Sequence, residues 1–172
     1  MVKRNWLPSP DALRRRYDYK VLFVSWADAA RGQLAEALLR HVSSGTFGSF
    51  SAGVEPADEI HPLSYVVLSE IGVAFGNQRP KSTLEVAGEG FDLVIVLGDD
   101  VRAVLPHWAG SATICWSYPA PGEVPEDYGE RLKGFRRLRD DLHERITTLF
   151  KTPVEQIGKK ALELSRRRFT SP

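Results

Sequence analysis

The stretch VLFVSWADAARGQLAEALLR, residues 21–40, changes from an apolar run to small and polar residues and then to a helical pattern. A strand that passes through a tight loop into a helix N-terminus presents backbone N–H groups, an arrangement that holds anions. We therefore predict an anion-binding loop that consists of Ser25, Trp26, Ala27, Asp28, Ala29, Ala30 and Arg31. A serine hydroxyl is a weak nucleophile without an adjacent base, and an aspartate adds negative charge. The sequence leaves open whether this loop is a functional anion site or the remains of one.

The composition is that of a globular protein, and it argues against several functional classes. The 172 residues suffice for one domain with a sizeable core, and a net charge of +1 gives no global attraction to nucleic acid or anionic membranes. The single cysteine, Cys115, excludes an intrachain disulfide, and its apolar neighbours predict a buried, inert thiol. No apolar segment has the length of a membrane span and no signal core is visible. We expect a cytoplasmic protein with no cofactor, no metal site and no nucleic-acid or membrane partner.

Apolar runs alternate with helical patterns along the chain. Strands are predicted at 20–24, 48–54, 91–97 and 111–118, and helices at 9–17, 31–40, 63–72, 126–150 and from 152 onward. Such alternation is typical of an α/β fold, here an open four-stranded parallel sheet with helices on both faces. The loops at 25–31, 98–100 and 117–122 would then emerge at the carboxyl edge of the sheet, where sites form.

The chain is expected to divide into three parts. Residues 1–19 form an N-terminal helical extension, 20–151 the main domain, and 152–172 a C-terminal helical extension with a basic tail. In the last part Thr152 is predicted to cap a helix in a capping box with Glu155.

Several stretches carry a resemblance to a known family: KVLFV, RGQLAEALLRH, FSAGVEPADEIHPLS, GNQRPKS, FDLVIV and FRRLRDDLHERI, in this order. Over roughly residues 20–150 the chain resembles the low-molecular-weight protein tyrosine phosphatases, and more closely the thioredoxin-coupled arsenate reductases that share their fold. The resemblance implies a cysteine nucleophile, an arginine six residues later that holds the oxyanion, and an aspartate, followed by proline, that protonates the leaving group.

Most of these implied groups are replaced here. Ser25 stands at the cysteine position, and Ala120 stands at the aspartate position in the sequence Ala-Pro. The two further cysteines of the arsenate reductases correspond to Gly98 and Leu105, so their disulfide relay cannot form. Arg31 alone is kept in full. Its side chain is predicted either to hold an oxyanion or to form an ion pair with Asp28 or another acid.

The loop interior also departs from the family. Ala27 replaces a usual glycine and is expected to restrict positive φ. Asp28 replaces an asparagine whose amide braces the loop, so we expect a negative charge beside any bound oxyanion. Gly32 replaces the hydroxyl residue that would support the nucleophile.

The other polar candidates are assigned structural roles. Asp99 and Asp100 are predicted as N-caps of a short helix, and His41 and His61 as helix-boundary residues. His107 and His143 show no metal-ligand spacing. A shifted loop could bring in Glu123 or Asp127 as a replacement acid, a hypothesis that we regard as secondary.

Aromatic side chains gather at the expected carboxyl edge. Trp26, Trp116, Tyr118 and Tyr128, together with Trp108, are predicted to contribute to an interface, because aromatic residues and arginine are common anchors there.

The primary hypothesis is a catalytically inactive phosphatase-like pseudoenzyme that acts as a regulatory module by binding a protein or small ligand, and a homodimer is compatible with it. The alternatives are a weak phosphatase that uses Ser25 or an unrecognised base, and an oxyanion sensor in which Arg31 and the loop amides bind phosphate or arsenate without chemistry.

Overall fold

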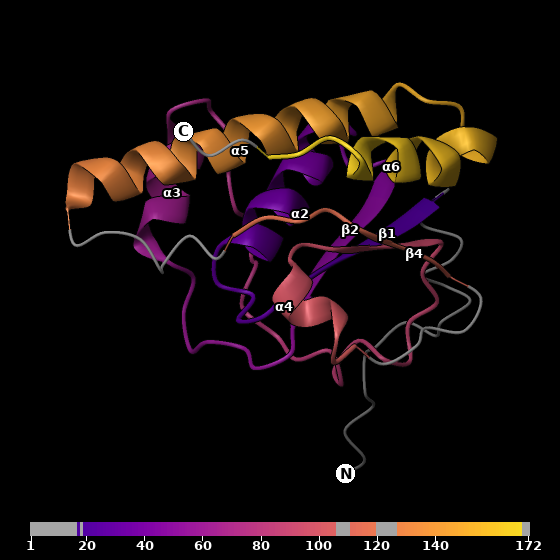
Figure 1. The fold of residues 1–172 in the computed structure, drawn as a ribbon, viewed down its shortest axis with the longest axis horizontal. Helices are drawn as coiled ribbons and strands as arrows, with labels where there is room; N and C mark the ends of the chain where they lie inside the picture. The colour runs from indigo at the N-terminus through magenta and orange to yellow at the C-terminus, as the bar shows by residue number, and fades with distance from the viewer. Residues whose placement is uncertain (1–16, 18, 106–110, 120–126, 170–172) are drawn as a thin grey trace, which may run out of the picture.

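A computed structural model of the chain describes residues 17, 19–105, 111–119 and 127–169. Within them, four parallel strands form one sheet in the order β2-β1-β3-β4 (Figure 1). The strands are β1 (Tyr19–Ser25), β2 (Phe47–Gly53), β3 (Leu93–Val96) and β4 (Ala112–Cys115). The helices are α2 (Arg31–Val42), α3 (Pro62–Ser69), α4 (Asp99–Arg102), α5 (Tyr128–Phe150), the 3-10 helix η1 (Val154–Gln156) and α6 (Ile157–Ser165). The predicted α/β fold class and the four-stranded parallel sheet are confirmed.

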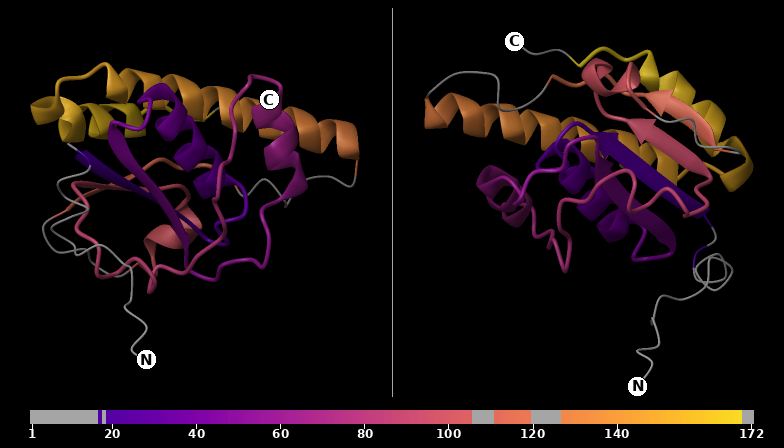
Figure 2. Two further views of the ribbon diagram at one scale, coloured as in Figure 1. Left: turned by 180° about the vertical axis from the view of Figure 1, so that it is seen from behind. Right: turned by 90° about the horizontal axis from the view of Figure 1, so that it is seen from below.

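Alternate side chains of the central strand β1 point to two hydrophobic clusters, one on each face of the sheet. Val21 and Phe23 belong to the larger cluster, which α2, α3, α5 and α6 cover. Leu22 and Val24 belong to the smaller one, which α4 and the turn-rich segment 82–91 cover. Figure 2 shows this unequal arrangement, with the long helix α5 across one face and only short pieces on the other. Helices therefore do lie on both faces, as the sequence predicts.

The C-terminal helix α6 is part of the main core. Its buried residues Ile157, Ala161 and Leu164 join the larger cluster, and the indole Nε1–H of Trp116 donates to the carbonyl oxygen of Ala161 at 3.1 Å. The predicted capping box is wrong, because α6 begins only at Ile157 and the Thr152 hydroxyl donates to the carbonyl oxygen of Thr148 at 2.8 Å. None of the described helices is both long enough and apolar enough to cross a membrane.

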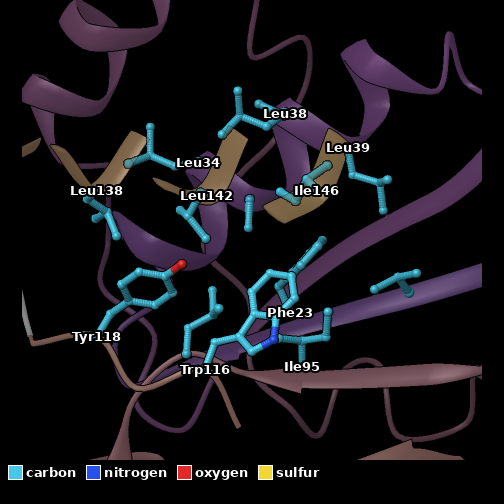
Figure 3. Close-up of a cluster of buried hydrophobic side chains, with 14 of the residues drawn as sticks. Phe23, Leu34, Leu38, Leu39, Ile95, Trp116, Tyr118, Leu138, Leu142 and Ile146 are labelled. Atoms are coloured by element: carbon cyan, nitrogen blue, oxygen red, sulfur yellow. The ribbon is translucent and has the colours of Figure 1, made fainter. Parts of the chain in front are cut away.

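Two of the five residues predicted as interface anchors are core residues. Trp116 is 0% exposed and Tyr118 is 2% exposed. Figure 3 shows both rings beneath Leu138 and Leu142 of α5 and Leu34 and Leu38 of α2. Both were predicted to lie at the carboxyl edge of a strand expected at 111–118, but β4 ends at Cys115, and α5 and α6 cover the segment that follows it. The prediction of an interface through Trp116 and Tyr118 is therefore wrong.

Other predictions differ in extent or fall outside the described residues. The helix expected at 63–72 ends at Ser69, and the one expected from residue 126 begins at Tyr128. The leading helix at 9–17 lies, apart from Tyr17, outside the described residues, as do Ala120, Glu123, His107 and Trp108.

Candidate functional site: the 25–31 loop

The 25–31 loop leaves the carboxyl end of β1 and enters α2. Backbone amides of the 54–61 segment donate hydrogen bonds of 2.8–3.3 Å to four carbonyl oxygens of the loop, those of Ser25, Trp26, Ala27 and Ala29. Within the described part of the chain, the amides of Ala29, Ala30 and Arg31 have no protein acceptor. They stand at the N-terminus of a 12-residue helix, where N–H groups and the helix dipole favour an anion. The backbone frame of the predicted anion loop is thus present.

Ser25 is the last residue of β1 and is 2% exposed. Its hydroxyl oxygen accepts a hydrogen bond from the backbone N–H of Asp28 at 3.2 Å. Among the described residues no histidine, carboxylate or amine forms a hydrogen bond with this hydroxyl, and such a base is what a serine nucleophile needs. The geometry is that of a strand-end hydroxyl that supports the turn.

The Arg31 side chain is turned toward α4. Its guanidinium forms two hydrogen bonds with Asp100, at 3.3 and 3.1 Å, and a third with the carbonyl oxygen of Tyr118 at 2.9 Å. The planar fork of arginine is suited to grip one carboxylate or phosphate in this way, so Asp100 occupies the position that an oxyanion would take on the fork. The prediction of an ion pair is confirmed, but its acid is Asp100 and not Asp28.

Glycine at position 98 permits this approach. A Cβ atom at Gly98 would lie 2.3 Å from a guanidinium nitrogen of Arg31 and 2.2 Å from an Asp100 carboxylate oxygen, and the residue has φ of 153°. Gly98 is also the N-cap of α4, so Asp99 and Asp100 form the first turn of this helix and are not its caps. Asp99 instead accepts hydrogen bonds from the Ser117 hydroxyl and, at 3.8 Å, the Cys115 thiol.

Cys115 is half-buried and free. Burial and the neighbouring Asp99 raise the pKa of its thiol, which therefore stays protonated at neutral pH. The raised pKa agrees with the prediction of an unreactive thiol. Cys115 is less buried than expected, however, because it lines a cavity of about 480 Å³ between α4, β4 and α6. Leu105, at a position matched to a family cysteine, lies in the same lining and packs against the smaller hydrophobic cluster.

Asp28 is placed differently from our expectation. Its side chain is 0% exposed, and its Oδ2 accepts a hydrogen bond from the backbone N–H of Lys81 at 3.0 Å. The carboxyl group is therefore buried against the backbone of Lys81, and its Oδ1 lies next to Gly32 in the first turn of α2. Burial raises its pKa to about 7, and the attraction of Lys81 offsets this effect only in part.

Backbone conformation and packing around Asp28 show how the loop accommodates alanine at position 27 and glycine at position 32. Ala27 is not among the non-glycine residues with positive φ, and the left-handed position in this loop is Asp28, with φ of 49°. Aspartate tolerates this region better than most side chains. A Cβ atom at Gly32 would lie 2.6 Å from Asp28 Oδ1, so Gly32 makes room for the buried carboxyl group.

A polar cluster next to Asp28 was missed by sequence reasoning. It consists of Gln33, Glu36, Ser51 and Lys81. The Ser51 hydroxyl donates to Glu36 at 2.6 Å, and Lys81 Nζ lies 3.4 Å from the same carboxylate oxygen. The available signal was a pair of polar residues, Gln33 and Glu36, among the small and apolar residues that follow Arg31 in the first turns of α2.

The remaining candidates have structural positions. His61 is the N-cap of α3 and accepts the Leu63 N–H at 3.1 Å, and His41 lies in the last turn of α2, as predicted. Asp127 caps α5 through the Glu130 N–H at 3.0 Å. Trp26 is partly buried against the smaller cluster, whereas Tyr128 is 58% exposed.

Comparison with known proteins agrees with this sheet and loop. Residues 20–162 match the family described as low molecular weight phosphotyrosine protein phosphatase. The glutaredoxin arsenate reductase of Synechocystis sp. is 25% identical over 131 residues, which are 76% of this chain and 95% of that protein. The solved arsenate reductase of Archaeoglobus fulgidus is 28% identical with a TM-score of 0.63, and the match covers 77% of this chain and 99% of that one. A solved arsenate reductase in the phosphate binding state is 26% identical with a TM-score of 0.63, over 77% of this chain and 96% of that one. The family match extends over most of the chain, and the strand order and the loop that enters α2 agree with it. The chain therefore belongs to the low molecular weight phosphotyrosine protein phosphatase family.

Proposed function

We propose that this chain is a catalytically inactive member of its family and acts in the cytoplasm as a regulatory binding module. The observation that carries the proposal is the state of the loop: a buried serine hydroxyl without a base stands where the family resemblance requires a thiolate. The Arg31 fork, which would stabilise the transferred group, is held by Asp100. Ala120 at the acid position gives no proton to a leaving group.

We expect no significant turnover of an aryl phosphate, and none of arsenate with thioredoxin or glutaredoxin as reductant. Serine, unlike cysteine, is not ionised by a helix N-terminus, and a chain with one cysteine cannot form an intramolecular disulfide. Steady-state assays of the purified chain, beside an active arsenate reductase as positive control, measure this. A turnover number on the order of 1 per second or more would contradict the proposal.

The partner that we propose is a protein or a small ligand. Of the predicted interface residues, Tyr128 on α5 is exposed and Trp26 is partly so, which leaves these two as candidate contacts. A homodimer is one form that such binding could take, and sedimentation equilibrium of the full chain tests it directly.

A second candidate is a non-catalytic oxyanion sensor, and one observation favours it. The amides of Ala29, Ala30 and Arg31 have no acceptor among the described residues and point from a helix N-terminus. Asp100 then acts as an internal competitor, because its carboxylate already satisfies the guanidinium that a phosphate would use.

The Asp100→Ala variant is expected to bind phosphate about tenfold more tightly than the wild type, because it frees the Arg31 fork. The gain is modest because the Asp100 side chain is 40% exposed and its charge is screened. Titration calorimetry measures it, with Asp99→Ala as a matched loss of charge that leaves Arg31 paired. Arg31→Ala should bind no phosphate. Equal affinities for Asp99→Ala and Asp100→Ala would show that Asp100 does not block the loop.

A further inference from the structure

The 25–31 loop rests on a buried group of two acids and one shared lysine. Lys81 Nζ lies 3.4 Å from Glu36 Oε2 and 3.9 Å from Asp28 Oδ2. The Glu36 carboxylate has further support, since Arg40 lies 3.7 Å from its other oxygen and the Ser51 hydroxyl donates to it at 2.6 Å. Asp28 is therefore the less well compensated of the two acids.

The Asp28 carboxyl group also has an unsatisfied atom. Its Oδ1 is fully buried and has no hydrogen-bond partner in the described part of the chain. The neighbouring Ser51 hydroxyl favours the ionised form of Asp28, but its proton is donated to Glu36 and its oxygen accepts from Gln33 and Lys81. A buried, ionised carboxylate with a bare oxygen is strongly disfavoured, whereas a neutral carboxylic acid has much less desolvation to overcome.

The same residue fixes the shape of the loop. Asp28 has the left-handed backbone conformation, its N–H binds Ser25 Oγ, and its Oδ2 ties the loop to the backbone of Lys81. Whatever changes the charge of this side chain acts directly on the turn that presents the α2 amides.

We propose that Asp28 is a positioning residue that holds a proton near neutral pH, so that a neutral carboxyl group seats the 25–31 loop and the loop loosens when the proton leaves. Asparagine, which the family resemblance places here, is neutral at every pH. The protonated carboxyl group of Asp28 is neutral like the asparagine amide, but unlike the amide it becomes negatively charged when its proton leaves. The loop is in this way sensitive to pH in the physiological range.

The charged and titratable groups around Asp28 agree with this assignment. Glu36 on α2 opposes its ionisation, while Lys81 and the more distant Arg79 favour it, and burial outweighs both cations. The Ser51 hydroxyl on β2 and the backbone N–H of Lys81 also favour ionisation, and burial outweighs these contributions as well. The resulting pKa is about 7, against an ordinary value near 4.

The sign of the pH dependence follows from these two values. Between about pH 4 and pH 7 the folded protein holds a proton that the unfolded chain has released, so the stability of the wild type falls as pH rises through this window. The melting temperature of the wild type should therefore fall, relative to that of Asp28→Asn, between about pH 4 and pH 7. Above about pH 7 the two melting temperatures should change with pH in parallel.

Nuclear magnetic resonance titration of the full chain tests the proposal. Amide signals of residues 26–31 should shift with a midpoint near pH 7 in the wild type, and this transition should be absent in Asp28→Asn. The asparagine variant is the matched control, because it keeps His61, whose backbone N–H binds Ala29 and whose imidazole pKa is lowered by burial. Glu36→Gln should move the midpoint to lower pH, and Lys81→Gln to higher pH.

Several outcomes would overturn the assignment. A midpoint below pH 5 in the wild type would show that Asp28 is ionised at neutral pH. The same transition in Asp28→Asn would assign it to another group. The readout needs no turnover and no bound phosphate, so it is independent of the assays of the proposed function, and chemical shifts outside the loop report whether each variant is folded.

Discussion

A Ser25→Cys variant is expected to remain a very poor phosphatase, whereas a variant that also carries Asp28→Asn, Asp100→Ala and Ala120→Asp should be at least about a hundredfold faster. The single change restores only the nucleophile. The added acid alone accounts for the expected difference, because general acid–base catalysis typically contributes about 10²–10⁴.

The structure explains why each further change is needed. Asp100 holds the Arg31 fork, so a bound phosphate must compete with an internal carboxylate. Asp28, when ionised, places a negative charge near the new thiol, since its Oδ1 and the Oγ of Ser25 lie 2.6 and 3.1 Å from the same point, a Cβ atom built at Gly32. A negative neighbour raises the pKa of a thiol and so reduces the thiolate fraction.

Steady-state hydrolysis of an aryl phosphate compares the two variants, and the pH dependence of alkylation reports the thiol at position 25. Both variants are made with Cys115→Ser, so that alkylation reports position 25 alone. The reconstruction with Arg31→Ala added is the control, and it should lose the gain. If the single variant already matches the reconstruction, our account of Asp28, Asp100 and Ala120 is wrong.

Local patterns were enough to predict the sheet and the position of the loop. β1 and β3 are short apolar runs that end at small or polar residues, and the run 91–97 stops at Gly98, close to the observed end of β3. Because parallel strands share a carboxyl edge, the sequence could also place the 98–100 loop beside the 25–31 loop. This placement is what brings Asp100 to Arg31.

The hydrogen-bond and ion-pair partners of individual side chains depend on tertiary packing and could not be predicted from the sequence. Asp28 is three residues from Arg31 and was the nearest acid in sequence, but its left-handed backbone turns its side chain under the loop toward Lys81. Trp116 and Tyr118 follow an edge strand, and only the fold of α6 shows that they are covered. No hydrophobic periodicity in residues 111–118 indicates that α6 covers these two side chains.

Arg145 is the clearest case of a charged residue placed in the core by this packing. It lies on the buried face of α5 and is 1% exposed. Its Nε is 2.7 Å from Asp141 Oδ2, and it donates to the carbonyl oxygens of Leu164 and Arg167, both at 3.0 Å. The guanidinium also stacks near the rings of Tyr118 and Trp116, at 5.2 and 5.5 Å from their centroids. One side chain therefore joins α5, α6 and the segment after β4.

Arg145→Met is expected to lower the free energy of unfolding by about 3–5 kcal/mol, the typical cost of removing one partner of a buried ion pair. Methionine keeps most of the volume, but two carbonyl groups lose the guanidinium as donor, and the Asp141 carboxylate loses its cation and keeps only the Tyr118 hydroxyl. Chemical denaturation measures the loss, with Arg137→Met on the same helix as control, since Arg137 has no ion pair among the described residues and should change stability by about 0.5 kcal/mol or less.

A double variant separates the charge from the packing. Asp141→Asn removes the stranded carboxylate and leaves an amide oxygen for the Tyr118 hydroxyl, which donates to Asp141 at 2.5 Å in the wild type. Arg145→Met with Asp141→Asn should therefore be more stable than Arg145→Met alone, with a coupling energy of about 1–3 kcal/mol. If Arg145→Met costs no more than Arg137→Met, then Arg145 does not hold α6 against β4, and the apolar contacts of Ile157, Ala161 and Leu164 hold it without the ion pair.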